Sequence, residues 1–134
     1  MRVHLPVVFL VGAHNDALAM HALGLLAMGF HPVTATTAEE AFERARRVQP
    51  QAIVEYVAPS SQAAVELTRR FRDDQRTSDA VILALSSDVR TSSTQHLKDA
   101  GCDRVLPEPC PPDALALEIH EAMMSRAARL GIGL

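Results

Sequence analysis

Three polar residues stand at the ends of short apolar runs, and they are the first candidates for chemistry. These residues are Glu55, Ser86 and Glu108. A carboxylate can bind a hard cation or move a proton, and a serine hydroxyl can hydrogen-bond an anion. If the apolar runs are strands of one open parallel sheet, functional groups gather at the strands' carboxyl ends. We therefore expect a site built from these three positions and from the residues after the first apolar run.

The sequence lacks the patterns of several other site chemistries. Its six histidines show no HExxH or Cys/His spacing, which disfavours a zinc site. Cys102 and Cys110 have seven residues between them and no CxxC pattern, so neither predicts redox chemistry. The segment 12–16 follows an apolar run but is no glycine-rich nucleotide fingerprint, although a helix starting there can hold an anion weakly.

Length and composition predict one soluble, cytoplasmic domain over 1–134, with a core from about 6 to 126 and a short C-terminal tail. The chain has 134 residues, 48% hydrophobic and 22% charged, which excludes a disordered chain. Its formal charge of -3 disfavours a nucleic-acid partner, and two cysteines suit a reducing compartment. The uncharged stretch 17–38 is interrupted by His31 and Pro32, so we expect no membrane span.

Apolar runs and helical patterns alternate five times along the chain. The expected strands are 7–11, a weaker one around Val33, 52–56, 80–85 and 104–106. The expected helices are about 16–28, 38–48, 61–71, 93–101 and 112–130. Strict alternation predicts an α/β fold, a doubly wound five-stranded parallel sheet with five helices, because right-handed crossovers place helices on both faces.

From Val7 to about Met124 the chain resembles the receiver (CheY-like) domain of bacterial response regulators, which has the flavodoxin-like fold. The resemblance rests on the element order and on four short segments. These are Glu55-Tyr56-Val57-Ala58-Pro59 at the Asp-x-x-x-Pro phosphoacceptor motif, Ala84-Leu85-Ser86-Ser87 at a strand ending in Thr or Ser, Ala100-Gly101-Cys102-Asp103, and Glu108-Pro109 at a Lys-Pro pair. The resemblance also implies a cis Glu108-Pro109 bond.

The departures from the family predict that Mg²⁺ binding and phosphotransfer are lost. A receiver holds Mg²⁺ with two adjacent carboxylates, and the matching pair here is Gly12-Ala13, without side-chain oxygens. Glu55 at the phosphoacceptor position is one methylene longer than Asp, although the spacing leaves its pairing uncertain by one residue. Glu108 replaces the lysine that neutralises phosphoryl charge. We expect no cofactor and no enzymatic activity.

The family's phosphorylation readout is also incomplete. Ser86 matches the switch hydroxyl, but Val105 stands where the family has a switch aromatic. These residues predict a degenerate pseudo-receiver of a two-component type system, acting through protein contacts. Glu55 as a mimic of a phosphorylated Asp remains open. So do a genuine phosphoacceptor with nonstandard residues and a flavodoxin-like binder of a small molecule near His14 and Asn15.

The first and last helices predict a protein interface. Between Asp16 and Glu39 the chain carries no charged residue, whereas a surface helix normally has a charged stripe. The interface candidates are Leu23, Leu26, Met123 and Leu130. The expected partner is a sensor kinase, an output domain or a second copy of the chain. By contrast, a basic set on the second and third helices, which includes Arg72, is expected to be a solvated face.

Overall fold

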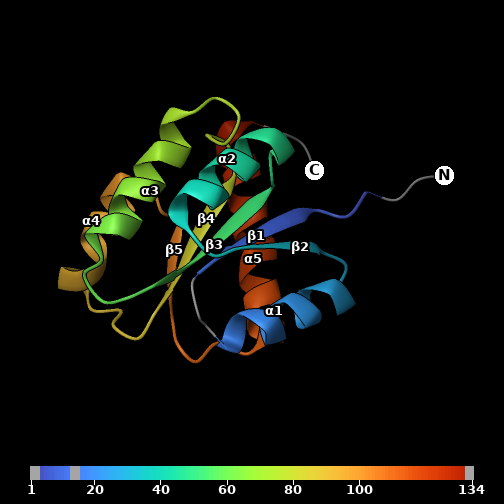
Figure 1. Cartoon of the computed structure of the whole chain (residues 1–134), viewed down its shortest axis with the longest axis horizontal. Coiled ribbons are helices and arrows are strands. Elements are labelled where there is room, and N and C mark those ends of the chain that lie inside the picture. Colours follow the sequence, from blue (N-terminus) through green and yellow to red (C-terminus); the bar gives the residue numbers. More distant parts are fainter. Residues whose placement is uncertain (1–3, 13–15, 132–134) are drawn as a thin grey trace.

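Five strands alternate with five helices in the described chain (Figure 1). The computed structural model describes residues 4–12 and 16–131. The strands are β1 (Val7–Val11), β2 (His31–Ala35), β3 (Ala52–Val57), β4 (Val81–Ser86) and β5 (Arg104–Pro107). The helices are α1 (Asp16–Ala27), α2 (Ala38–Val48), α3 (Gln62–Asp73), α4 (Thr91–Ala100) and α5 (Pro112–Leu130). The predicted elements are therefore confirmed, with boundaries that differ by one or two residues.

All five strands are parallel and lie in the order β2-β1-β3-β4-β5. This is the flavodoxin-like order of a doubly wound sheet, so the predicted fold class is confirmed. β1 has β2 on one side and β3 on the other, and the order reverses at β1. The crevice of such a sheet lies at this reversal, beyond the carboxyl ends of the strands.

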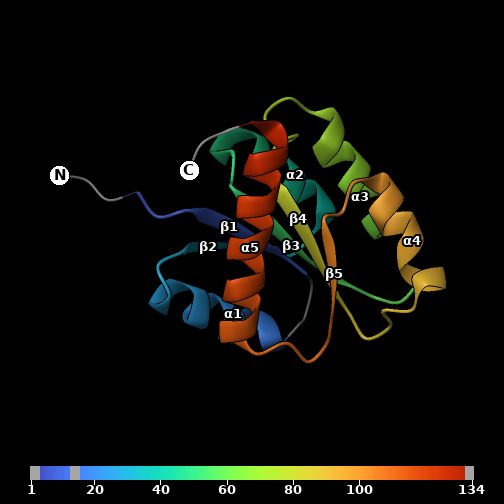
Figure 2. The same cartoon turned by 180° about the vertical axis from the view of Figure 1, so that it is seen from behind.

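Two helical layers cover the sheet. α1 and α5 lie on one face, and α2, α3 and α4 lie on the other (Figures 1 and 2). Side chains alternate between the two faces along each strand, so the sheet has a separate core on each face. Val8, Leu10 and Val54 pack towards α1 and α5. Phe9 and Ile53 pack towards α2, α3 and α4. Both cores are mainly aliphatic.

Local signals in the sequence set several helix boundaries. The Thr37 hydroxyl accepts a hydrogen bond from the Glu40 amide at 3.1 Å, which caps the start of α2. Gly29 follows α1 with φ of 91°, a conformation that glycine adopts without a steric penalty. Gly24 lies inside α1, where an added Cβ would stand 2.3 Å from Pro112 Cβ. Gly24 therefore allows α1 to approach the start of α5.

Arg72 is a structural residue, so its expected place on a solvated face is wrong. Its guanidinium lies 2.8 Å from Asp103, and it also donates to the carbonyl oxygens of Ser78, Ala80 and Gly101. These contacts tie α3 to the start of β5. Only 14% of the Arg72 side chain is exposed. A basic residue at the end of a helix normally stays in water, but here its donors satisfy loop carbonyls.

Within residues 4–12 and 16–131, no helix combines the length and the hydropathy needed to cross a bilayer. The uncharged stretch that begins in α1 is divided between a helix of 12 residues and β2. This division agrees with the expectation drawn from His31 and Pro32.

Candidate functional site

Gly12 lies beside Tyr56 at the carboxyl ends of the central strands. β1 and β3 pair with Val11 opposite Glu55, so the next residue along each strand is Gly12 and Tyr56. A Cβ atom on Gly12 would stand 3.0 Å from Tyr56 Cβ and 3.1 Å from its ring. Real side chains approach this closely only when a neighbour moves. A side chain at position 12 would therefore require Tyr56 to shift slightly.

Tyr56 also forms the inner wall of a cavity of about 370 Å³. The cavity lies between the first half of α1 and the segment from β5 to α5. Its described lining consists of Ala17, Met20, His21, Tyr56, Ser87, Glu108, Pro109 and Cys110. The Glu108-Pro109 bond is cis, as expected from the resemblance. Three positions at the carboxyl ends of β3, β4 and β5 thus meet α1 in one pocket.

His21 is a central residue of this pocket that the sequence interpretation did not single out. It is only 2% exposed. Its Nε2 lies 2.6 Å from the Cys110 carbonyl oxygen, and its Nδ1 lies 2.8 Å from the Tyr56 hydroxyl oxygen. A carbonyl oxygen only accepts, so Nε2 carries a proton, and in a neutral ring Nδ1 accepts from Tyr56. The signal for His21 was its place as the one polar residue of α1 after Asp16.

Tyr56 is held as a neutral phenol in this arrangement. Burial raises the pKa of Tyr56 most, and the nearby Glu108 carboxylate raises it further because both groups would be negative. The phenol proton is therefore available for donation to His21 Nδ1. The Tyr56 and His21 rings stack with their centroids 5.7 Å apart. Together they form a rigid wall.

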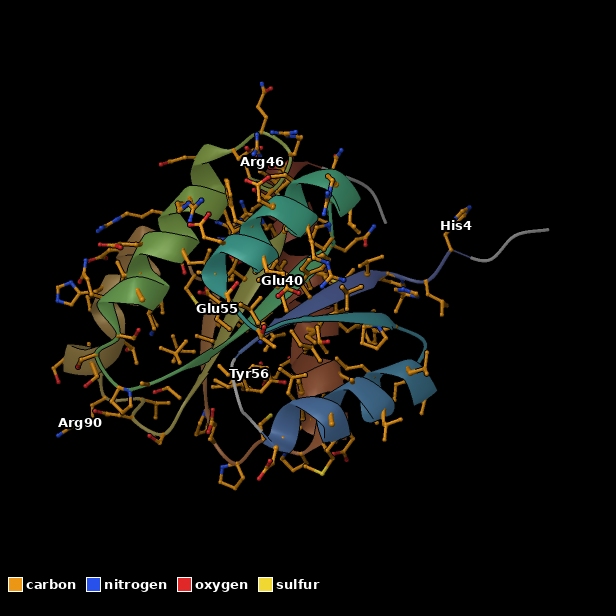
Figure 3. All side chains as sticks on the ribbon, viewed as in Figure 1. His4, Glu40, Arg46, Glu55, Tyr56 and Arg90 are labelled. Carbon is orange, nitrogen blue, oxygen red and sulfur yellow. The ribbon has the colours of Figure 1, made fainter. Side chains whose placement is uncertain are left out.

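Glu55 does not lie in this cavity, which corrects its expected place beside Glu108. Glu55 and Tyr56 are neighbours in β3, so their side chains leave opposite faces of the sheet. Tyr56 points towards α1, whereas Glu55 lies on the side of α2 and α3 (Figure 3). Glu55 is 2% exposed and lines a separate cavity of about 160 Å³ with Gly12 and Thr36. The side chain between Gly12 and Glu108 is Tyr56.

Burial raises the pKa of Glu55 to about 7, although the Thr68 hydroxyl and the Arg72 charge act in the opposite direction. The Thr68 hydroxyl has two acceptors within hydrogen-bond distance. Thr68 Oγ1 lies 2.6 Å from Glu55 Oε2 and 2.9 Å from the Ala64 carbonyl oxygen, yet the hydroxyl has one proton. If Glu55 is protonated, it donates to Thr68 and Thr68 donates to Ala64. Both contacts are then satisfied.

The other oxygen of Glu55 has no partner. Glu55 Oε1 is buried and makes no hydrogen bond to any described residue. A buried carboxylate oxygen without a donor is costly when it carries charge. This observation agrees with a neutral Glu55. Glu55 lies beneath α3, and its raised pKa lowers the ionised share of this acid near neutral pH.

The hydroxyl and the valine of the expected readout lie apart from the cavity. Ser86 is buried, and its Oγ accepts from the Asp88 amide and donates to the Asp88 carbonyl, both at 3.1 Å. The next residue, Ser87, is exposed and lines the cavity. Val105 packs against the core beneath α2, α3 and α4. Ser86 thus forms a local turn, and Ser87 is the hydroxyl residue at the cavity.

The described residues do not fit a Mg²⁺ site of the receiver type. Gly12 offers no side-chain oxygen, and its close neighbour Tyr56 offers an uncharged phenol instead of a carboxylate. Glu55 and Glu108 lie on different faces of the sheet and cannot share one ion. In the ranges 4–12 and 16–131, no three His, Cys, Asp or Glu residues gather as a metal would require. The described residues do not include Ala13. They also do not include His14 and Asn15, which belong to the expected ligand crevice.

Three of the four interface candidates are exposed. The exposed fraction is 71% for Leu23, 54% for Leu26 and 45% for Leu130. Met123 is only partly exposed and packs against the core between the sheet and α5. Other large apolar residues are exposed on the same helices. They are Met20 and Leu117, together with Met124 near the end of α5.

No protein-family model and no curated protein matches the sequence. Solved structures match the fold. Chemotaxis response regulator CheY4 of Vibrio cholerae has a TM-score of 0.80 at 19% identity, covering 89% of this chain and 99% of that one. A response regulator from Thermotoga maritima has a TM-score of 0.78 at 21% identity, covering 90% and 99%.

A third match is the receiver domain of a sensor histidine kinase from Pseudomonas aeruginosa, solved with a magnesium ion coordinated in the active site cleft. Its TM-score is 0.77 at 16% identity, and the alignment covers 90% of this chain and 99% of that one. These likenesses show that the chain has the CheY-like, flavodoxin-like fold of receiver domains. That domain holds a metal ion in its cleft. Gly12 of this chain offers no side-chain oxygen to such an ion.

Proposed function

We propose that this chain is a receiver-like signalling domain of a bacterial two-component type system that no longer undergoes Mg²⁺-dependent phosphotransfer. It is cytoplasmic and non-enzymatic, and it acts through protein contacts. One observation carries the proposal. Gly12 has no side-chain oxygen where a receiver has a carboxylate for Mg²⁺, and the uncharged Tyr56 side chain is its close neighbour. An uncharged phenol there neither binds Mg²⁺ well nor attacks a phosphoryl group.

The charge of the cavity supports the same conclusion. Glu108 stands at the Lys position of the resemblance and is the charged residue of the described lining. A phosphoryl dianion entering the cavity would meet a like charge instead of a counterion, which raises its energy in a partly buried site. The alternative of a genuine phosphoacceptor at Glu55 requires a buried acid to leave its contact with Thr68. We therefore favour a pseudo-receiver.

The protein contact involves the exposed apolar residues of α1 and α5. We call these residues the α1–α5 surface and define it as Met20, Leu23, Leu26 and Leu117. The two helices are neighbours on one face of the sheet (Figure 2). Apolar area removed from water contributes about 25 cal/mol per Å², so a few hundred Å² would drive association before ordering costs are deducted. Candidate partners are a sensor kinase, an output domain or a second copy.

The test replaces Leu23 and Leu26 together with Glu. Both side chains are more than half exposed, so the double variant should fold with an unchanged far-UV circular dichroism spectrum. Light scattering should show that the wild type self-associates at high concentration, or a pull-down should show a bound partner kinase or output domain. The double variant should lose that association.

The matched control replaces Val48 and Val89 with Glu, because these residues are also exposed but lie outside α1 and α5. The control should associate like the wild type. A monomeric wild type without a partner, combined with unfolding of the Leu23 and Leu26 variant, would assign both leucines to the core and end the interface proposal. Equal loss of association in the control would show that added charge alone disrupts it.

A further inference from the structure

The cavity beside α1 has the size and wall chemistry of a small-molecule site. Its volume of about 370 Å³ lies within the usual range for ligand pockets, roughly 300 to 1,000 Å³. Met20 and Pro109 contribute apolar walls, and the Tyr56 ring closes the inner end. Such pockets typically combine apolar surface with a few polar groups that orient the ligand. Here the polar groups are Glu108, Ser87 and the Tyr56 hydroxyl.

Glu108 gives the cavity a negative rim. No Lys or Arg is present in the described lining. Within residues 4–12 and 16–131, the Glu108 carboxylate forms no ion pair. The Glu108 charge also acts on the cavity wall, because it raises the pKa of Tyr56. The cavity thus offers a carboxylate that no described side chain neutralises.

The inner wall adds a second attraction for positive charge. The face of an aromatic ring attracts a cation, and Tyr56 is an uncharged phenol whose ring lines the cavity. Its hydroxyl is held by His21 Nδ1, and His21 is in turn held by the Cys110 carbonyl. These two hydrogen bonds fix the ring, so it does not need to be ordered when a ligand arrives. Preorganised walls reduce the entropic cost of binding.

We propose that this cavity binds a small organic cation, an ammonium or amidinium group carried on a compact apolar body. The positive charge pairs with Glu108, and the apolar body packs against Met20, Pro109 and the Tyr56 ring. Organic anions are rejected because they would meet Glu108 with like charge. The inference goes beyond the proposed signalling role and does not depend on the loss of phosphotransfer, although the cavity shares Met20 with the α1–α5 surface.

Tyr56 provides a direct readout of binding. It is the single tyrosine of the chain, and there is no tryptophan, so the intrinsic fluorescence reports on this cavity wall. The probes are cyclohexylamine as the cation, cyclohexanecarboxylate as the anion and cyclohexanol as the neutral form, because none absorbs where tyrosine does. Cyclohexylamine should change the Tyr56 emission in a saturable way, with a Kd of about 1 mM for so few atoms. The other two probes should bind at least roughly tenfold more weakly.

Variants at Glu108 test the assigned contact. Glu108 is exposed, so Glu108→Gln should fold and should weaken cyclohexylamine binding by roughly tenfold. Glu108→Lys should reverse the preference and favour cyclohexanecarboxylate. The matched control is Glu66→Gln, which removes the same charge from an exposed position on α3 and should leave binding unchanged.

Two results would overturn the proposal. One is the absence of a saturable response to cyclohexylamine in the wild type. The other is binding that Glu108→Gln leaves within twofold of the wild type, or that all three probes share equally. A two-dimensional amide spectrum gives an independent check, because the peaks of Met20, Ser87 and Cys110 should move most. These outcomes do not depend on Mg²⁺ or on association, so they are distinct from a failure of the proposed function.

Discussion

Glu55→Gln should remove a pH-dependent loss of stability. The side chain is buried beneath α3, and burial raises its pKa from the ordinary 4.5 to about 7. At pH values between 4.5 and about 7, Glu55 keeps its proton in the folded chain but has released it in the unfolded chain. Stability is therefore highest below about pH 4.5 with respect to this group, and it falls as the pH rises through about 7. Gln cannot ionise, so the variant lacks this loss.

The size of the effect follows from the two pKa values. At 1.36 kcal/mol for each pH unit between them, ionising Glu55 costs roughly 3 kcal/mol of unfolding free energy. Urea unfolding followed by far-UV circular dichroism, at about pH 5 and about pH 8, measures the cost. The wild type should lose up to roughly 3 kcal/mol more than Glu55→Gln between these conditions. Glu66→Gln, at an exposed site, should behave like the wild type.

This design separates ionisation from packing. A Gln amide that fits poorly beside Thr68 would shift the variant's stability by the same amount at both pH values. All other ionisable groups are the same in the wild type and in the variant, so their contribution cancels in the comparison. Identical pH dependence in the wild type and Glu55→Gln would show that Glu55 is ionised in the folded chain at neutral pH, and our account of its hydrogen bonds with Thr68 would then be wrong.

Two further predictions concern Tyr56 and Gly24. Spectrophotometric titration of the single tyrosine should show no ionisation at about pH 10.5 in the folded chain and normal ionisation in urea, because burial and Glu108 raise the pKa of Tyr56; a normal titration in the folded chain would place the phenol in water. Gly24→Ala should destabilise the chain by about 1 to 3 kcal/mol in urea unfolding, because its Cβ would overlap Pro112. Ala22→Gly, in the same helix, provides a comparison for helix propensity, and an unchanged or more stable Gly24→Ala would show that α1 and α5 are less closely packed there.

The fold was predictable because its signals are local. Continuous apolar runs such as 81–85 mark strands buried on both faces, and capping residues such as Thr37 mark where helices begin. Gly29 predicted the end of α1, and its positive φ confirms that a glycine conformation follows this helix. Strict alternation then left few topologies, and the resemblance to receiver domains selected the flavodoxin-like one.

The site was harder to predict because it depends on which face each side chain occupies. β3 is apolar on both faces, so its sequence did not indicate whether Glu55 or Tyr56 points towards Glu108. His21 was missed because its partners are 35 and 89 residues away in the chain. Arg72 looked like its solvated neighbours, and only the loops around Ser78 and Gly101 show why it is buried. Long-range contacts of this kind leave little trace in a single sequence.

The most direct test of the central claim is treatment of the folded chain with Mg²⁺ and a phosphoryl donor. Acetyl phosphate with Mg²⁺ should leave the intact mass unchanged. Beryllofluoride with Mg²⁺, which mimics a bound phosphoryl group, should leave the amide spectrum unchanged, because Gly12 offers no carboxylate to Mg²⁺ and Glu108 repels the anion. A stable added phosphoryl group on Glu55, or saturable amide shifts around Gly12 that require both Mg²⁺ and beryllofluoride, would contradict the account.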